Sequence, residues 1–308
     1  MKNLLVVLGP TASGKTRLGV ELARELGGEI VSADSRQVYR GLDIGAGKDL
    51  DEYSAGGSPV AFHLIDIVDL DVEFSVFAYQ QKFFSVFDDL QARGVMPIVV
   101  GGSGLYLEAV LSGYRMVDVP ADPILRADLE SSSHEDLVRQ LQALRPVHNT
   151  TDLKDRERLV RAIEITQYSA QHEPEPGPDI RPVVLGVRWD RKLLRKRIRE
   201  RLGARLEAGL IDEVQHLHED GVSWEKLSFL GLEYRFVSDY LRGRIKNDND
   251  LKQKLAAAIC SFAKRQETWF RRMERRGTEI HWLDGGDCDQ ARRIIADCGG
   301  LTDGREGR

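Results

Sequence analysis

The sequence Gly9-Pro10-Thr11-Ala12-Ser13-Gly14-Lys15-Thr16 lies between an apolar run, Leu4 to Leu8, and a helical pattern, Leu18 to Leu26. Glycines let such a loop turn tightly, so that successive backbone N–H groups point at an anion, and the helix that follows adds the positive end of its dipole. Lys15 supplies a positive charge, and the Thr16 hydroxyl can bind Mg²⁺. Because a strand precedes the motif and a helix follows it, we predict a phosphate-binding P-loop.

The motif leaves open which phosphate it binds, because nucleoside triphosphates, nucleotides and prenyl diphosphates all fit such a loop. Of the 308 residues, 44 are Lys or Arg and 49 are Asp or Glu, so the net charge of −5 provides no global basic field for nucleic acid. Basic residues nevertheless cluster between Arg188 and Arg205 and again between Lys264 and Arg276. Either cluster is a candidate binding surface for a polyanion.

The cysteines and the N-terminus indicate the compartment. Cys260, Cys288 and Cys298 are unevenly spaced and show no pattern of metal ligands, which is typical of proteins in a reducing environment. The chain opens on a predicted strand rather than a secretion leader, and no apolar run approaches the length of a membrane span. We therefore expect a cytoplasmic protein that does not enter a membrane, and we take a monomer as its state.

Strand and helix patterns alternate through most of the chain. Strands are predicted at 4–8, 29–35, 63–68, 94–100, 182–187 and 280–283, and helices between them at 16–26, 74–92, 105–111, 193–206, 211–219 and 252–273. This alternation predicts an α/β fold, a parallel sheet with helices on both faces like that of P-loop NTPases.

The alternation of strands and helices stops between Asp118 and Pro178. Three helical patterns, at 122–129, 135–144 and 156–168, follow one another there without an intervening strand, and a proline-rich linker ends the region. We therefore predict a core at 1–117, a small all-helical insert at 118–178, and the second part of the core, with the C-terminal helices, at 179–308.

Polar residues follow three of the predicted strands. Because the carboxyl ends of parallel strands lie at one edge of a sheet, Lys15, Thr16, Asp34, Ser35 and Ser103 should surround a single cleft. A phosphate site, a carboxylate and hydroxyl groups in one place make this cleft a candidate reaction site.

Several longer motifs follow one another over nearly the whole chain. They are the P-loop, Asp34 to Gly45 (DSRQVYRGLDIG), His63 to Asp66 (HLID), Gly101 to Tyr106 (GGSGLY), Ala263 to Gln266 (AKRQ), Thr268 to Arg271 (TWFR) and His281 to Asp284 (HWLD). These motifs, in this order, resemble those of the tRNA dimethylallyltransferases. Together they are far more specific than a P-loop alone. The resemblance implies transfer of the dimethylallyl group of dimethylallyl diphosphate to N6 of the adenosine at position 37, beside the anticodon of tRNA. It implies Mg²⁺ as cofactor and a P-loop that holds the prenyl diphosphate rather than ATP.

The resemblance also implies a role for each matching residue. Asp34 is the implied base or hydrogen-bond acceptor at the adenine amine, Ser103 replaces a family threonine that positions this amine, and Thr16 is implied to hold the metal. The implied diphosphate ligands, with Lys15 also catalytic, are Gly9, Thr11, Ala12, Ser13, Gly14, Lys15, Thr16, Arg197 and Arg201. The implied tRNA contacts are Asp34, Ser35, Arg36, Gln37, Arg126, Arg158, Arg161, Tyr234 and Arg235, together with His148 and Asn149 of the insert.

The chain departs from the family pattern at two places. The family's Asp-Ile-Gly-Thr-Ala-Lys-Pro is DIGAGKD here, at 43–49, and Glu233 precedes Tyr234 where the family usually has Gly. A glutamate on the path of tRNA repels phosphate unless a cation such as Arg235 neutralises it. These departures raise the alternative of a divergent paralogue with an altered RNA preference.

Three other functions stay open. One is prenylation of free adenine nucleotides, which needs the P-loop and Asp34 but neither the helical insert nor the basic block at Lys264. Another is a P-loop kinase of small molecules, in which Asp66 or Asp69 would hold the metal. The third is an RNA-binding paralogue without turnover, against which the intact P-loop argues.

Overall fold

The computed structural model describes residues 2–145, 153 and 155–301. The chain forms two compact units. Met1–Gly113 and Pro178–Arg308 make up the core unit, and Tyr114–Gly177 makes up the helical unit, for which the sequence predicted 118–178. Each unit is described by itself below.

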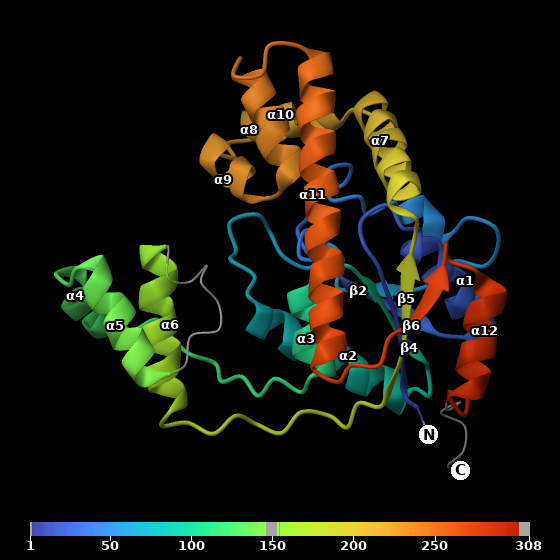
Figure 1. Ribbon diagram of the computed structural model, residues 1–308, viewed down its shortest axis with the longest axis horizontal. Coiled ribbons are helices and arrows are strands. Elements are labelled where there is room, and N and C mark those ends of the chain that lie inside the picture. Colours follow the sequence, from blue (N-terminus) through green and yellow to red (C-terminus); the bar gives the residue numbers. More distant parts are fainter. Residues whose placement is uncertain (1, 146–152, 154, 302–308) are drawn as a thin grey trace. The chain divides into compact units, whose positions relative to one another are not determined.

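A six-stranded parallel sheet lies at the centre of the core unit (Figure 1), which confirms the predicted α/β fold. Its strand order is β3-β2-β4-β1-β5-β6, and each neighbouring pair is parallel. The strands are β1 (Leu4–Leu8), β2 (Glu29–Ala33), β3 (Phe62–His63), β4 (Pro97–Gly101), β5 (Pro182–Arg188) and β6 (His281–Asp284). β1 and β4 are buried along their whole length because helices cover both faces of the sheet.

β3 is much shorter than its prediction, which ran from His63 to Val68. Beyond the strand, Leu64 has φ 61° and Asp66 has φ 55°. L-residues in an extended strand have negative φ, so the chain leaves the sheet there and enters a turn. The apolar residues of this segment, Leu64 and Ile65, are buried all the same.

Two groups of helices cover the two faces of the sheet (Figure 1). On one face lie α1 (Lys15–Leu26) and α12 (Cys288–Asp297), and on the other α2 (Val76–Ala92), α3 (Gly104–Leu111) and the C-terminal part of α11 (Asp248–Arg275). Side chains alternate along a strand, so Leu5 and Val7 of β1 pack on the first group while Leu4, Val6 and Leu8 pack on the second.

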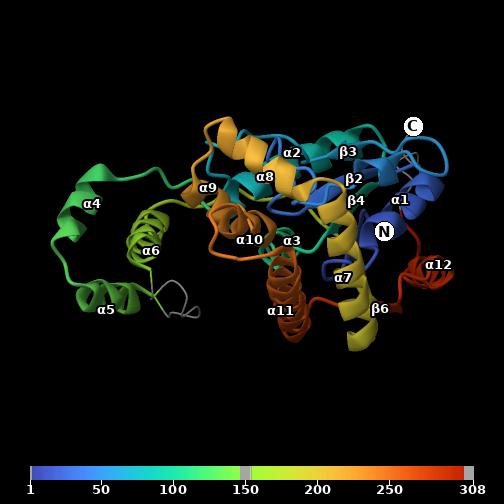
Figure 2. The same ribbon diagram turned by 90° about the horizontal axis from the view of Figure 1, so that it is seen from above.

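A third apolar cluster forms beyond the end of the sheet, around the N-terminal part of α11 (Figures 1 and 2). It includes residues of α7 (Arg191–Glu207), α8 (Leu210–Glu219), α9 (Trp224–Phe229) and α10 (Leu232–Leu241). The sequence did not predict α9, α10, α12 or the 3₁₀ helix Leu50–Tyr53. α9 and the 3₁₀ helix, with 6 and 4 residues, are too short to show an apolar period. Within the described ranges, every helix is too short or too polar to cross a membrane.

The helical unit contains the three helices that the sequence predicted. They are α4 (Pro123–Glu130), α5 (His134–Leu144) and α6 (Arg156–Ser169), each begun by a side chain that accepts a backbone N–H, namely Asp122, Ser133 and Asp155. Their apolar faces meet in a core of their own, formed by Leu129, Leu137, Leu141, Leu159, Ala162 and Ile163.

Candidate functional site

A cavity of about 740 Å³ opens at the carboxyl edge of the sheet, entirely within the core unit. The P-loop, the loop after β2, residues 45–49, and helices α7 and α9 to α11 all contribute to its wall. The structure brings together there the five residues that sequence reasoning assigned to one cleft: Lys15, Thr16, Asp34, Ser35 and Ser103.

The P-loop has the backbone conformation that an anion site requires. Ala12 has φ 61° and Gly14 has φ 87°, both in the left-handed region. Such residues within a turn let successive backbone N–H groups point into one concave site, here just before α1. Lys15 Nζ donates to the carbonyl of Pro10 at 3.4 Å. Burial, and next the guanidinium of Arg201, lower the pKa of Lys15 to about 8. A bound anion would favour the charged form of this buried lysine.

The loop after β2 is fixed from two sides. One carboxylate oxygen of Asp34, Oδ1, accepts the backbone N–H of Arg36 at 2.9 Å, which holds the turn. The Ser103 hydroxyl accepts the backbone N–H of Ser35 at 3.0 Å, and the Ser103 N–H donates to the carbonyl of Ala33 at 3.1 Å. Ser103 thus connects the ends of β2 and β4 and orients the segment that carries Asp34.

Gln266 of α11 joins two glycine-rich loops. Its Oε1 accepts the N–H of Thr11 at 2.9 Å, and its Nε2 donates to the carbonyl of Gly102 at 2.9 Å. Sequence reasoning included Gln266 in a family-like block but assigned it no role. Gln266 is buried, so its amide supports the cavity wall and is not a surface group.

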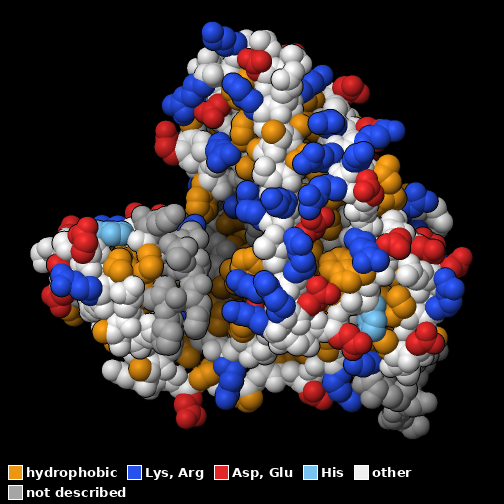
Figure 3. Space-filling view, viewed as in Figure 1, with side chains coloured by type: hydrophobic (Ala, Val, Ile, Leu, Met, Phe, Trp, Pro, Cys, Tyr) orange, Lys and Arg blue, Asp and Glu red, His pale blue; other side chains and the backbone are white. Residues whose placement is uncertain are grey.

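Helix α7 presents arginines to the P-loop. Arg197 Nε donates to the carbonyl of Ala12 at 2.8 Å, and its guanidinium stacks 4.6 Å from the ring of Trp189, whose indole N–H holds the carbonyl of Ser13 at 2.8 Å. Arg201 Nη1 lies 3.5 Å from the Thr11 hydroxyl. Both arginines predicted to bind phosphate therefore adjoin the loop. The space-filling view shows further Lys and Arg side chains over α7 and α11 (Figure 3).

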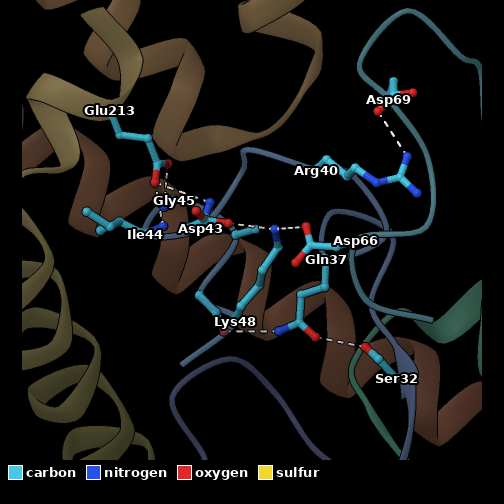
Figure 4. A network of polar contacts seen from close by, with 12 residues as sticks. Ser32, Gln37, Arg40, Asp43, Ile44, Gly45, Lys48, Asp66, Asp69 and Glu213 are labelled. Atoms are coloured by element: carbon cyan, nitrogen blue, oxygen red, sulfur yellow. Dashed lines mark hydrogen bonds and ion pairs between the residues drawn. The ribbon is translucent and has the colours of Figure 1, made fainter. Parts of the chain in front are cut away.

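The altered segment 43–49 is held by a carboxylate of α8 (Figure 4). Glu213 accepts the backbone N–H groups of Asp43 at 3.2 Å, Ile44 at 2.6 Å and Gly45 at 3.0 Å. The hydroxyl of Tyr234 donates to the same carboxylate at 2.7 Å. Three successive amides and one carboxylate form a turn that fixes the side of the cavity facing α7.

Lys48 anchors the other end of this segment (Figure 4). Its side chain is 1% exposed, and its ammonium group pairs with Asp43 at 2.7 Å and with Asp66. Gln37 donates to the carbonyl of Gly47 at 3.0 Å and accepts from the Ser32 hydroxyl at 2.7 Å. Glu213 did not stand out in the sequence because the amides that it holds are distant in the chain, and Lys48 was noted only as part of the altered segment 43–49.

The structure places the residues predicted to contact tRNA in different settings. Four of them line the cavity, namely Ser35, Arg36, Gln37 and Arg235. The side-chain amide of Gln37, however, donates a hydrogen bond to the carbonyl of Gly47. Tyr234 is 1% exposed, and its hydroxyl is held by Glu213, so its burial argues against a direct RNA contact by this side chain.

The remaining predicted tRNA contacts belong to the helical unit. Arg126 and Arg161 both pair with Glu164, at 2.8 and 2.6 Å, and Arg158 is exposed on α6. His148 and Asn149 lie outside the described residues. Burial raises the pKa of Glu164, but hydrogen bonds from Arg126, the backbone N–H of Asp122 and Arg161 together lower it to about 2, so this carboxylate stays charged.

Glu233 does not stand free in the path of an RNA. Its side chain is 17% exposed and its Oε1 lies 3.4 Å from Nη1 of Arg205, a residue that sequence reasoning did not single out. The cation that neutralises Glu233 is therefore Arg205 rather than Arg235. The four-residue spacing of Arg197, Arg201 and Arg205 could have indicated a shared helix face.

The cavity wall contains oxygen donors of the type that Mg²⁺ accepts. Thr16 and the carboxylates of Asp34, Asp49 and Glu52 all line it, and hydroxyl and carboxylate oxygens are the ligands that this hard cation accepts. Burial, and next the charge of Asp49, raise the pKa of Glu52. Asp49 in turn pairs with Arg201, so the wall of the cavity carries both carboxylates and guanidinium groups.

Comparisons with known proteins agree over nearly the whole chain. A family model described as IPP transferase matches residues 37–273, and one described as isopentenyl transferase matches residues 2–58. The chain is 59% identical over 291 residues to tRNA dimethylallyltransferase 1 of Syntrophus aciditrophicus, covering 93% of this chain and 95% of the relative. It is also 59% identical over 299 residues to tRNA dimethylallyltransferase 2 of Trichlorobacter lovleyi, covering 96% of each.

A solved structure has the same fold. It is the full-length tRNA isopentenylpyrophosphate transferase of Bacillus halodurans, which superposes with a TM-score of 0.69 at 32% identity and covers 97% of this chain and 96% of its own.

Proposed function

Because this chain belongs to the IPP transferase family, we propose that it transfers the dimethylallyl group of dimethylallyl diphosphate to N6 of the adenosine at position 37 of tRNA, next to the anticodon. The observation that supports this most strongly is that one cavity joins a P-loop to the carboxylate of Asp34 and the hydroxyl of Ser103. A diphosphate on the P-loop would place its prenyl group toward these side chains.

The chemistry needs a proton acceptor beside the amine. The C–N bond forms between N6 and C1 of the prenyl group while the C–O bond to diphosphate breaks, and the leaving diphosphate takes that electron pair. The exocyclic amine of adenine is a poor nucleophile, and Asp34 accepts its proton as the new bond forms. Ser103 keeps Asp34 in place, since it binds the backbone of the next residue.

The diphosphate gains negative charge as it leaves. Lys15, the P-loop amides, Arg197 and Arg201 lie where that charge develops, and preorganised positive groups stabilise it most in a cavity that excludes water. We propose that Thr16, together with carboxylates of the cavity, binds Mg²⁺. When bound, this ion neutralises diphosphate oxygens.

The acceptor base has to leave its stack to reach Asp34. N6 of a stacked adenosine is not accessible to a side chain at the bottom of a cavity, so the nucleotide enters as a flipped base. Arg36 lies 5.7 Å from the ring of Phe229, and both line this cavity. We propose that they receive the RNA at its entrance, with the exposed Arg235 nearby.

The two carboxylates that a kinase would have used to hold its metal are paired elsewhere. Asp66 pairs with Lys48, and Asp69 pairs with Arg40 at 2.9 Å, so both carboxylates are engaged outside the cavity wall. We further propose that the protein is cytoplasmic, which agrees with its three free cysteines. We also propose that it is a monomer, which light scattering of the purified protein tests.

The function is tested by transfer of labelled dimethylallyl groups to unmodified bulk tRNA, with AMP and ATP as parallel acceptors and Mg²⁺ present. We expect label in tRNA that disappears in the Lys15→Ala variant. Label in AMP or ATP but not in tRNA would instead support prenylation of free nucleotides. Salt-dependent RNA binding without transfer would support the paralogue without turnover.

A further inference from the structure

Three arginines of α7 face the same cavity. Arg197, Arg201 and Arg205 follow one another at four-residue intervals, which places them on one face of the helix, and each of them lines the cavity wall. The first two adjoin the P-loop. Arg205 has no part in the function described so far, and a buried cation in an active-site wall calls for one.

Arg205 and Arg201 meet on the backbone of Gly47. A Cβ atom added to Gly47 would collide with the guanidinium of Arg205 and would lie 2.8 Å from Nη2 of Arg201. Gly47 also has φ +62°, a conformation that side chains disfavour. The glycine in the altered segment 43–49 therefore gives both guanidinium groups access to one small region of the cavity.

The positive charge gathered there is only partly paired, because Arg201 pairs with Asp49 while Arg205 has only a longer contact with Glu233. Burial, and next Arg201, lower the pKa of Arg205, and both arginines contribute to the lowered pKa of Lys15. The Arg205 side chain is 12% exposed, its pairing with Glu233 is loose at 3.4 Å, and its Nε has no hydrogen-bond partner among the described residues. A buried charged donor without an acceptor is unfavourable, and an anion in the cavity would satisfy it.

We propose that Arg205 is a third arginine ligand of the leaving diphosphate, and that Glu233 holds it in position before the donor binds. This proposal rests on the function proposed above and extends its phosphate site by one residue. Charge-assisted hydrogen bonds from a guanidinium to phosphate are among the strongest in proteins, and they stabilise the charge that grows on diphosphate as the C–O bond breaks. The Glu233 that replaces the family's usual glycine then acts on the prenyl donor, not on the tRNA.

The test measures binding of inorganic diphosphate by isothermal titration calorimetry with Mg²⁺ present. Replacing Arg205 alone strands the buried Glu233 carboxylate and threatens folding, so the informative variant is Arg205→Met combined with Glu233→Gln. We expect this double variant to bind diphosphate about ten- to a hundredfold more weakly than the unmodified protein, as loss of a charge-assisted contact predicts. Glu233→Gln alone keeps Arg205 and an oxygen acceptor for it, so it should bind diphosphate more tightly than the double variant does.

Two further variants separate the possible failures. Arg199→Met removes an exposed arginine of the same helix, outside the cavity, and should leave the affinity unchanged. If Lys15→Ala abolishes binding while the double variant binds normally, Arg205 merely balances Glu233, and the proposal is wrong although the proposed function stands. If the unmodified protein binds no diphosphate, the proposed function fails with it.

Discussion

Gln266 Oε1 accepts a 2.9 Å hydrogen bond from the backbone N–H of Thr11 and so ties the middle of α11 to the P-loop. The same amide donates to the carbonyl of Gly102. We expect Gln266→Leu to destabilise the protein by about 2 kcal/mol, because it leaves the buried carbonyl of Gly102 and the half-buried N–H of Thr11 without partners. Transfer should fall at least about tenfold, since the P-loop loses a support. Thermal unfolding and transfer assays measure both effects. Gln253→Leu, an exposed position on the same helix, is the matched control. A Gln266 variant as stable and active as this control contradicts the assignment.

Asp34 is predicted to act in catalysis and not in folding. Asp34→Asn keeps an oxygen that can accept the N–H of Arg36, so the turn should persist. We expect kcat to fall by about 10² to 10⁴, the usual contribution of a general base, with tRNA affinity within a few fold. Single-turnover transfer and filter binding separate the two quantities. Asp69→Asn, whose carboxylate pairs with Arg40 outside the cavity, serves as control. Loss of tRNA binding in Asp34→Asn would make this residue structural.

The lowered pKa of Lys15, about 8, makes diphosphate binding sensitive to pH. Diphosphate binds better to the protonated lysine. The affinity for diphosphate should therefore fall once the pH exceeds the pKa of Lys15 in the unliganded protein, approaching about tenfold per pH unit. Lys15→Arg stays protonated throughout. The ratio of the two affinities between about pH 7 and pH 9 therefore reports the lysine, because protonation of diphosphate itself is common to both proteins. A ratio independent of pH contradicts the assignment.

Lys48 is predicted to be essential for the segment 43–49. Its ammonium group is buried and pairs with Asp43 and Asp66. The double variant Asp43→Asn with Asp66→Asn should cost about 3 kcal/mol of stability, because it leaves the Lys48 charge buried without a carboxylate partner. Arg40→Met breaks an exposed pair with Asp69 and should cost less than about 1 kcal/mol. Chemical denaturation compares the two. Equal losses in the free energy of unfolding would show that the burial of Lys48 does not contribute to the stability of the protein.

The sequence was sufficient where function depends on neighbours in the chain. The P-loop, the Asp34 turn and the central strands are set by local glycine, cap and apolar patterns, and all of them are found. Contacts between distant segments were not predictable in this way. Gln266 is 255 residues from Thr11, and Glu213 is 170 residues from the amide of Asp43 that it holds. The burial of Tyr234 likewise depends on packing between α8 and α10, for which one sequence contains no signal.

The most direct test of the central claim is nucleoside analysis of tRNA treated with the purified protein, dimethylallyl diphosphate and Mg²⁺. After digestion and mass spectrometry, we predict one new N6-dimethylallyladenosine per substrate tRNA, located next to the anticodon and strongly reduced with Asp34→Asn at equal reaction time. Product at other adenosines, in free nucleotides only, or equally abundant with Asp34→Asn would contradict the account.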